Sequence, residues 1–181
     1  MRRLIFILIV AVFGNWAGAA KGQDIAKLGD QASSGGSSVA IEKMKITDLE
    51  SYIAHSDHPL IVNFWATFCV PCCKEIPYFE STVNQFKDQK VELLLVSLDL
   101  PAYYPARIAD FVQKSGFGSR ILWLNETDAD YFCPKVDPRW TGGIPCSLFI
   151  NNATHYRRFF DRQLTEPQVG LEIKKLISPQ P

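Results

Sequence analysis

The sequence predicts an α/β fold with a central mixed sheet flanked by helices. Two apolar runs, at residues 60–66 and 91–98, are nearly continuous, which is typical of strands buried on both faces of a sheet. Segments with helical spacing follow each run, so that buried strands alternate with helices. The 181 residues are 47% hydrophobic, which supplies a core for one domain and excludes a wholly disordered chain.

Charge and cysteine content exclude two further classes of protein. The 19 basic and 19 acidic side chains give a formal net charge of zero, whereas a nucleic-acid surface needs a clustered positive excess. No nucleic-acid partner is therefore expected. Five cysteines are too few for a small disulfide-stapled protein, and their number is odd. We therefore expect at least two of the cysteines to have a role other than holding the fold together.

The predicted elements begin after residue 45. Thr47 and Asp48 are suitable N-caps for a short helix that ends near His55. The following elements are, in chain order, a strand at 60–66, a helix to about residue 86, a strand at 91–98, a helix at 106–114 and a short strand at 121–124.

The last elements predict that part of the sheet is antiparallel. After a helical turn at 128–132, the segments 147–150 and 156–160 have the composition of strands, and the turn residues Asn151-Asn152 allow them to pair as a hairpin. Thr165 caps a final helix. Its apolar positions are Val169, Leu171, Ile173, Leu176 and Ile177.

The N-terminus has the pattern of a secretory signal peptide. Arg2 and Arg3 precede the apolar run 4–13, and a stretch of small residues ends at Ala20. We expect a periplasmic or secreted protein with three parts: a signal peptide at 1–19, a flexible segment rich in serine and glycine at 20–45, and one domain at 46–181. The alternative is an uncleaved membrane anchor, although the apolar run is short against the roughly 20 residues that cross a bilayer.

Two cysteines in a Cys-x-x-Cys spacing carry the chemistry. Cys69 and Cys72 lie where the strand at 60–66 ends and a helix begins, so they can form a disulfide across the first helical turn. The unpaired N–H groups and the helix dipole at this position lower the pKa of a thiol. We therefore expect Cys69 to be the nucleophile and Cys72 to resolve the mixed disulfide. Pro71 has no backbone N–H, and this costs nothing in the first turn of a helix, where N–H groups have no carbonyl partner within the helix.

Two other readings of this spacing are weaker. A zinc site needs four ligands, but there is no second Cys-x-x-Cys, and His55, His58 and His155 are scattered along the chain. No metal is therefore expected. A purely structural disulfide would close a very small loop and constrain the unfolded chain little. The strand-turn-helix context favours a redox pair.

Further features accompany the cysteine pair. The strand before it ends in Phe64-Trp65-Ala66, Pro77 stands in the helix after it, and Ile144-Pro145 precedes a later strand. Together with the order of the elements, these features resemble the exported thioredoxin-fold thiol–disulfide oxidoreductases of the TlpA/ResA type. The resemblance covers roughly two thirds of the chain and omits residues 20–45.

The resemblance implies a thioredoxin-like fold with a TlpA-type helix–strand insertion before a cis-proline loop. Pro77 is expected to separate a short active-site turn from the rest of its helix. The Ile144-Pro145 bond is expected to be cis and to present the backbone of Ile144 to a substrate segment. The implied substrate-binding residues are Ile144, Pro145, Phe68 and Pro71.

One position departs from ordinary thioredoxins, which have a buried aspartate near the resolving cysteine. Asn63 stands there and cannot accept a proton from Cys72. Glu75 lies three residues after Cys72, as in ResA-like proteins, where a glutamate tunes the site. Because helical residues three apart share a face, its carboxylate could accept a proton from the Cys72 thiol or repel the thiolate. The alternative is a solvated helix glutamate.

The remaining cysteines are Cys73, Cys133 and Cys146. Cys73 points about 100° around the helix from Cys72, so packing is its expected role. Cys133 and Cys146 could be buried thiols or a second disulfide. We expect all three to be free.

The sequence thus predicts an exported oxidoreductase that exchanges the Cys69–Cys72 pair with cysteines of other exported proteins. The resemblance implies a reductant that receives electrons from a membrane thiol reductase, with apocytochromes among its clients. We expect a monomer, and no cofactor, because both electrons reside on sulfur. The alternatives are a redox-inert peptide-binding module, or a peroxide reductase, which would need a lone peroxidatic cysteine with an activating Thr and Arg.

Overall fold

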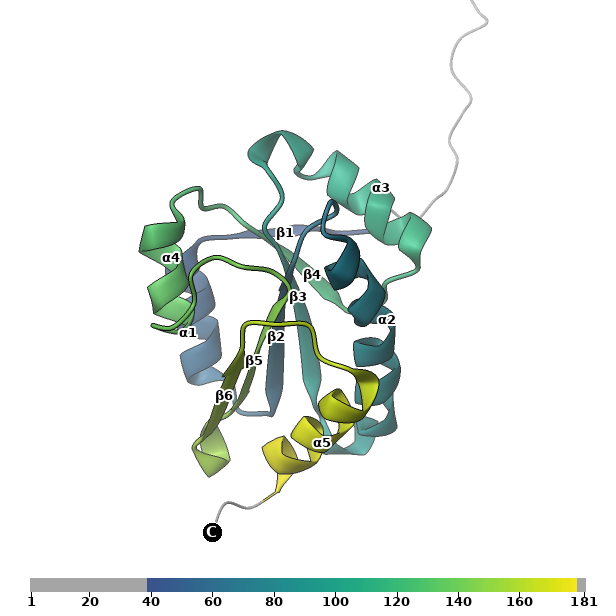
Figure 1. Ribbon diagram of the computed structural model, residues 1–181, viewed down its shortest axis with the longest axis vertical. Coiled ribbons are helices and arrows are strands. Elements are labelled where there is room, and N and C mark those ends of the chain that lie inside the picture. The colour runs from purple at the N-terminus through teal and green to yellow at the C-terminus, as the bar shows by residue number, and fades with distance from the viewer. Residues whose placement is uncertain (1–38, 179–181) are drawn as a thin grey trace, which may run out of the picture. The chain divides into compact units, whose positions relative to one another are not determined.

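The computed structural model describes residues 39–178, and their six strands form one mixed sheet in the order β1-β4-β3-β2-β5-β6 (Figure 1). The strands are β1 (Glu42–Met44), β2 (Leu60–Trp65), β3 (Glu92–Ser97), β4 (Arg120–Leu124), β5 (Cys146–Asn151) and β6 (Tyr156–Phe160). The helices are α1 (Ile46–His55), α2 (Val70–Gln85), α3 (Ala106–Ser115), α4 (Ala129–Val136) and α5 (Glu166–Ile177).

The directions of the strands confirm the mixed sheet. β1, β4, β3 and β2 run parallel to their neighbours, whereas β5 is antiparallel to both β2 and β6. In the register, Trp65 at the end of β2 lies beside Ser97 at the end of β3, and Phe64 lies beside Cys146 at the start of β5. The carboxyl end of β2 therefore meets the end of one neighbour and the beginning of the other.

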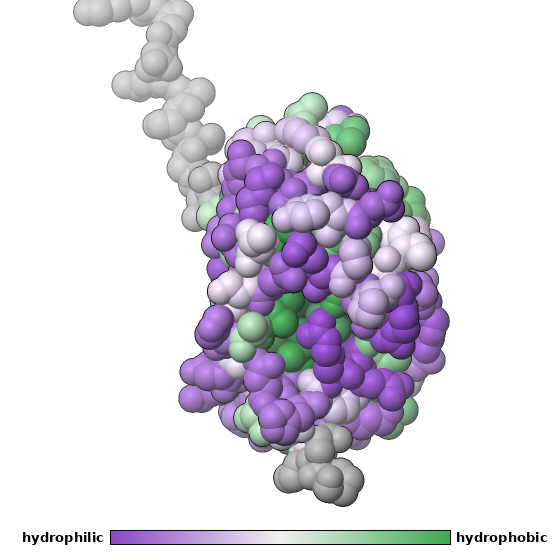
Figure 2. All heavy atoms as spheres, turned by 90° about the vertical axis from the view of Figure 1, so that its left-hand side faces the viewer, coloured by the Kyte–Doolittle hydropathy of each residue, from purple (hydrophilic) through white to green (hydrophobic). Residues whose placement is uncertain are grey.

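Helices cover both faces of the sheet (Figure 1). α2, α3 and α5 pack on the face to which Ile61 and Trp65 point, and α1 and α4 pack on the face of Val62 and Phe64. The two sets alternate along β2 because successive side chains of a strand point to opposite faces. Seen from the side of α1 and α4, the surface is mostly hydrophilic, with apolar residues visible in a recess (Figure 2). Asn63 belongs to the α2 face by the same alternation.

Part of the segment that we predicted to be flexible is a strand. We expected a flexible segment over 20–45, but Glu42–Met44 form β1, which pairs in parallel with β4. Arg120 of β4 donates to Glu42 at 2.6 Å. β1 is an edge strand of three residues, and two of its side chains are charged and exposed. Because it contains no apolar run, the sequence did not predict a strand there. The predicted signal peptide, 1–19, lies outside the described residues.

Three helix details also differ from the expectations. α1 begins at Ile46, so Asp48 lies inside its first turn, where its carboxylate accepts from Lys45 N at 3.2 Å. Leu171 of α5 is 58% exposed, so it does not belong to the buried face. α2 continues through Pro77 as one helix instead of being divided there. Pro77 is exposed, so the carbonyl that lacks its N–H partner can bond to water.

No helix among residues 39–178 is long and apolar enough to span a bilayer.

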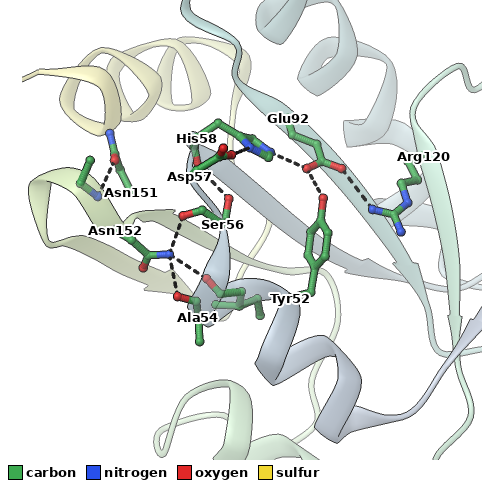
Figure 3. A network of polar contacts seen from close by, with 11 residues as sticks. Tyr52, Ala54, Ser56, Asp57, His58, Glu92, Arg120, Asn151 and Asn152 are labelled. Carbon is green, nitrogen blue, oxygen red and sulfur yellow. Dashed lines mark hydrogen bonds and ion pairs between the residues drawn. The ribbon is translucent and has the colours of Figure 1, made fainter.

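A network of polar contacts lies at the end of the sheet opposite to the cysteine pair (Figure 3). Glu92, at the start of β3, accepts from the Tyr52 hydroxyl at 2.5 Å and lies 2.7 Å from His58 Nε2 and 3.6 Å from Arg120 Nη1. His58 Nδ1 lies 2.8 Å from the carboxylate of Asp57. Burial and the neighbouring carboxylate of Glu92 raise the pKa of Tyr52 to about 12.

We expect the network to make stability depend on pH through His58. Its contacts with Asp57 and Glu92 raise the pKa of His58 above its ordinary value. The folded state then binds the proton more tightly than the unfolded state, so this stabilisation is present below about pH 6.5 and disappears as pH rises through the raised pKa. Urea unfolding at several pH values should show that His58→Gln lowers the free energy of unfolding in acid and changes it little in alkali. A loss that stays constant with pH would contradict this account.

Candidate active site

Cys69 and Cys72 form a disulfide at the beginning of α2. Cys69 is the N-cap residue, and Cys72 lies in the first turn, with 5.3 Å between their Cα atoms. The Cys69 sulfur accepts from Cys72 N at 3.3 Å, so it already takes one of the unpaired donors of the helix start. Cys69 is 8% exposed and Cys72 is fully buried. Of the two cysteines, Cys69 is therefore the more accessible.

A short turn connects β2 to the disulfide. Cys69 N donates to Ala66 O at 3.0 Å, which closes the turn at residues 66–69. Val70 and Pro71 occupy the first two helical positions. The helix dipole and the remaining N–H groups point at the Cys69 sulfur, an arrangement that stabilises a thiolate.

Glu75 is fully buried one turn after Cys72. It belongs to the apolar stripe of α2 that faces the sheet, with Cys72, Ile76 and Phe79. Its carboxylate accepts from Asn63 Nδ2 at 2.8 Å and from Leu164 N at 3.1 Å. Burial raises the pKa of Glu75 from 4.5 to about 7, although both hydrogen bonds act in the opposite direction. The alternative of a solvated helix glutamate is therefore wrong.

Asn63 lies on the sheet directly beneath Glu75. Its side chain points to the α2 face, and its Nδ2 also donates to Ser147 Oγ at 2.9 Å on the neighbouring strand β5. Asn63 Oδ1 is buried without a hydrogen-bond partner among the described residues. An unpaired buried acceptor is costly, and it can be satisfied when a neighbouring group gains a proton. Glu75 contacts the same amide, but through its donor Nδ2, so in this orientation of the amide the Glu75 carboxyl does not satisfy Oδ1.

The Ile144-Pro145 peptide bond is cis, as the sequence predicted. Pro145 is buried directly before Cys146, and Cys146 pairs with Phe64 of β2. After Phe64, the chain passes through Trp65 and Ala66 into the turn that ends at Cys69. Ile144 is half-buried and packs against the core cluster that contains both redox cysteines. A second cis bond, Tyr104-Pro105, which precedes α3, was not predicted.

Exposed apolar side chains surround the disulfide. Phe68 and Val70, on either side of Cys69, are each 62% exposed, and Leu100, in the loop after β3, is 60% exposed. Asp99, the residue before Leu100, is hydrogen-bonded to Thr67, which places Leu100 near the same turn. These three side chains are among the large apolar side chains that stay exposed in the part of the chain that the structure describes.

The structure brings the predicted site residues together and adds others that the sequence analysis missed. Leu164 and Gln163 in the loop before α5 bind the active-site helix, through Glu75 and through Pro71 O, which accepts from Gln163 Nε2 at 3.4 Å. The Tyr78 hydroxyl donates to Leu164 O. No local motif marks this loop. Asp99 could have been identified from the sequence, because polar residues just after the carboxyl end of a parallel strand often line functional sites.

Cys73, Cys133 and Cys146 are free in the structure. Cys73 is half-buried, and its thiol donates to Ala66 O at 3.6 Å. Burial and then the charge of Asp99 raise the pKa of Cys73. Burial also raises the pKa of Cys133 to about 11 and raises that of Cys146 still further. All three thiols therefore remain protonated near neutral pH and are weak nucleophiles.

The chain is similar to several curated and solved proteins. It is 29% identical over 124 residues to the thiol-disulfide oxidoreductase ResA of Halalkalibacterium halodurans, a match that covers 67% of this chain and 63% of the relative. It is 35% identical over 117 residues to the protein of the same name from Geobacillus kaustophilus, which covers 65% of this chain and 62% of the relative. The chain thus matches less than two thirds of the length of these relatives.

Solved structures share the fold at lower sequence identity. A thioredoxin-related protein from Neisseria meningitidis serogroup B superimposes with a TM-score of 0.57 at 21% identity, covering 67% of this chain and 86% of that chain. A thioredoxin-family thiol:disulfide interchange protein from Chlorobium tepidum gives 0.55 at 15% identity, covering 71% and 85%. The thioredoxin-like fold is therefore confirmed. The AhpC/TSA family model matches residues 33–152, more than half of the chain. The chain belongs to the AhpC/TSA family of thioredoxin-fold proteins.

Proposed function

We propose that the protein is an exported thiol–disulfide oxidoreductase that acts as a reductant on cysteines of other exported proteins. The observation that carries the proposal is the Cys69–Cys72 disulfide at the start of α2, in a core cluster against which Ile144 of the cis peptide bond Ile144-Pro145 packs. The relatives named thiol-disulfide oxidoreductase support the same reaction class.

The reaction consists of two exchange steps. The Cys69 thiolate of the reduced protein attacks one sulfur of a client disulfide, forms a mixed disulfide with it and releases the other client sulfur as a thiolate. The Cys72 thiolate then attacks the Cys69 sulfur, forms the Cys69–Cys72 disulfide and releases the second client thiolate. Two electrons have moved to the client, and the released thiolates take up protons. A donor dithiol reverses both steps on this protein.

Glu75 is the candidate base for the second step. Cys72 must lose a proton before it attacks, and a base is most effective when its pKa lies near the working pH. Burial places the pKa of Glu75 at about 7, whereas Asn63 cannot take up a proton. Glu75 and Cys72 share the buried face of α2. Because the charged carboxylate also repels a thiolate, Glu75 favours thiols over thiolates in the reduced protein.

The surface around Cys69 suits an extended client segment. We assign the backbone of Ile144, before the cis bond, as the edge with which a client strand pairs. Phe68, with the neighbouring Val70, offers apolar contacts, and Pro71 leaves no backbone N–H to satisfy in that turn. This surface favours clients with apolar residues beside the reactive cysteine.

The remaining parts of the proposal rest on the sequence pattern. The signal peptide at 1–19 supports export, with a periplasmic or secreted monomer as the working form. A membrane thiol reductase supplies electrons, and apocytochromes are among the clients. We assign part of the segment α3-β4-α4, between β3 and Pro145, to a TlpA-type insertion.

Insulin reduction in the presence of dithiothreitol tests this function. We expect the mature protein to accelerate the precipitation of insulin chains, and Cys69→Ser/Cys72→Ser to be inactive although it is folded. A redox-inert binding module would show no difference between the two proteins. Peroxide consumption that proceeds in Cys72→Ser without a dithiol client would indicate a peroxide reductase instead.

A further inference from the structure

Asp99 is a buried carboxylate that the exchange mechanism has not used. It follows β3 by two residues and is 3% exposed. Among the ion pairs of residues 39–178, none includes Asp99. Burying a carboxylate without a cation is costly unless hydrogen bonds compensate for the lost water. Its hydrogen bonds therefore show what it stabilises.

Most of these bonds come from the turn that presents Cys69. Thr67 N donates to both oxygens of Asp99, at 3.0 and 3.2 Å, and the Thr67 hydroxyl donates at 2.6 Å. Ser97 Oγ donates at 2.7 Å from the end of β3. Thr67 is the second residue of the turn 66–69, which Cys69 N closes by donating to Ala66 O at 3.0 Å. Asp99 thus binds the turn two residues before the attacking sulfur.

Asp99 is itself firmly held. Its own N–H donates to Ser97 Oγ at 3.1 Å, and its carbonyl accepts from Trp123 Nε1 of β4 at 2.8 Å. Leu98 N, one residue earlier, donates to Trp65 O at 2.8 Å. The backbone at residues 98–99 is therefore bound to β2 and β4, and the carboxylate to Ser97 of β3, so Asp99 can transmit the rigidity of the sheet to the turn.

The charge of Asp99 also acts on one thiol at the start of α2. After burial, it is the second cause that raises the pKa of Cys73, which lies on the same turn of the helix as Cys72. A carboxylate in this position opposes the helix dipole, which favours thiolates. Glu75 lies on the buried side of the helix, so two acids flank the helix start.

We propose that Asp99 is a positioning residue for the exchange reaction: its buried carboxylate binds Thr67 and so holds the turn Ala66–Cys69 in the shape that presents Cys69 to a client disulfide. The inference rests on the proposed function, because it concerns how that reaction reaches the sulfur. Asp99 does not touch the reacting atoms and takes no part in proton transfer.

Asp99→Asn tests the inference with two measurements on the reduced protein. One is the rate at which iodoacetamide alkylates Cys69 as a function of pH, and the other is the rate of exchange with a protein disulfide such as insulin. We expect the alkylation midpoint to move to lower pH, because a negative charge is lost. The exchange rate per thiolate should fall about tenfold, roughly the effect of one hydrogen bond to a charged group. Alkylation of the full thiolate should be unchanged, because a small reagent needs no oriented turn.

Two further variants keep the test decisive. Thr67→Val removes the hydroxyl bond but leaves the charge, so it should slow exchange without moving the alkylation midpoint, even if Asp99→Asn does not fold. Glu80→Gln is the matched control, since Glu80 also fixes a loop, accepting from Gly118 N and Ser119 N at 2.8 Å each. It lies about 15 Å further along α2 and should change neither rate.

The outcomes separate this inference from the proposed function. If wild-type protein reduces insulin and both Asp99→Asn and Thr67→Val match it in exchange rate and alkylation midpoint, Asp99 does not position Cys69. If equal losses occur in Glu80→Gln, the effect is a general loss of rigidity and the inference is wrong. If wild-type protein exchanges with no disulfide, the proposed function itself fails.

Discussion

Replacing Cys72 with Ser should trap mixed disulfides between Cys69 and client proteins, whereas Cys69→Ser should trap almost none. Cys69 keeps 8% of its surface exposed at the helix start, whereas Cys72 is fully buried. Without Cys72 the second exchange step cannot occur, so the first product accumulates. Without Cys69, a client cannot reach the remaining thiol. Diagonal gels of both variants, expressed as the full chain, measure the difference.

The double variant Cys69→Ser/Cys72→Ser is the control for adducts of the other thiols. It should trap nothing, because burial keeps Cys133 and Cys146 protonated, and Cys73 is held in the same state. Equal trapping by the two single variants would show that the order of attack is wrong. Trapping in the double variant would assign client chemistry to one of the other three cysteines.

Glu75→Gln should lower the thiol pKa values and yet slow the resolution of the mixed disulfide. The substitution removes a charge that repels thiolates, which can shift a coupled neighbour by roughly one pKa unit. It also removes the only base on the buried face of α2, so Cys72 loses its proton acceptor. Thiolate absorbance as a function of pH measures the first effect, and stopped-flow decay of a trapped mixed disulfide measures the second. Superimposable titration curves would show that Glu75 is not coupled to the thiols.

The same variant should change how stability depends on pH. Because the pKa of Glu75 is raised from 4.5 to about 7 in the folded disulfide form, the folded state binds this proton more tightly than the unfolded state. The resulting stabilisation is present below about pH 4.5 and is lost as pH rises through about 7, up to about 3 kcal/mol in the free energy of unfolding. Relative to Glu75→Gln, the wild-type protein should therefore weaken over this range. Parallel curves for the two proteins would contradict the buried, protonatable carboxyl.

Strong local signals predicted most of the fold and the centre of the site. Short, near-continuous apolar runs are typical of strands buried on both faces, and β2 and β3 were placed correctly on that basis. The cysteine spacing at a strand–helix junction located the disulfide, and the Ile144-Pro145 motif located the cis bond. The position of Glu75 also followed from local geometry, because three residues separate neighbours on one helix face.

The features that the sequence did not predict depend on contacts between distant segments. β1 has two charged residues and becomes a strand only because β4 offers an open edge. Leu171 has the apolar character of a core residue, but the rotation of α5 on α2 leaves it exposed. The bond from Leu164 N to Glu75 joins positions 89 residues apart, and that from Asp99 to Thr67 joins positions 32 apart. Such pairs become visible only when the topology is known.

The reduction potential of the Cys69–Cys72 pair tests most directly whether this protein is a reducing dithiol. The protein should be equilibrated with mixtures of reduced and oxidised dithiothreitol or glutathione, and its disulfide fraction measured by alkylation at each ratio. Two buried acids beside the helix start disfavour thiolates, so the reduced form lacks the stabilised thiolate that makes a dithiol a strong oxidant. We predict a value near about −270 mV, as in thioredoxin, whereas a value near about −120 mV would identify an oxidant and contradict the account.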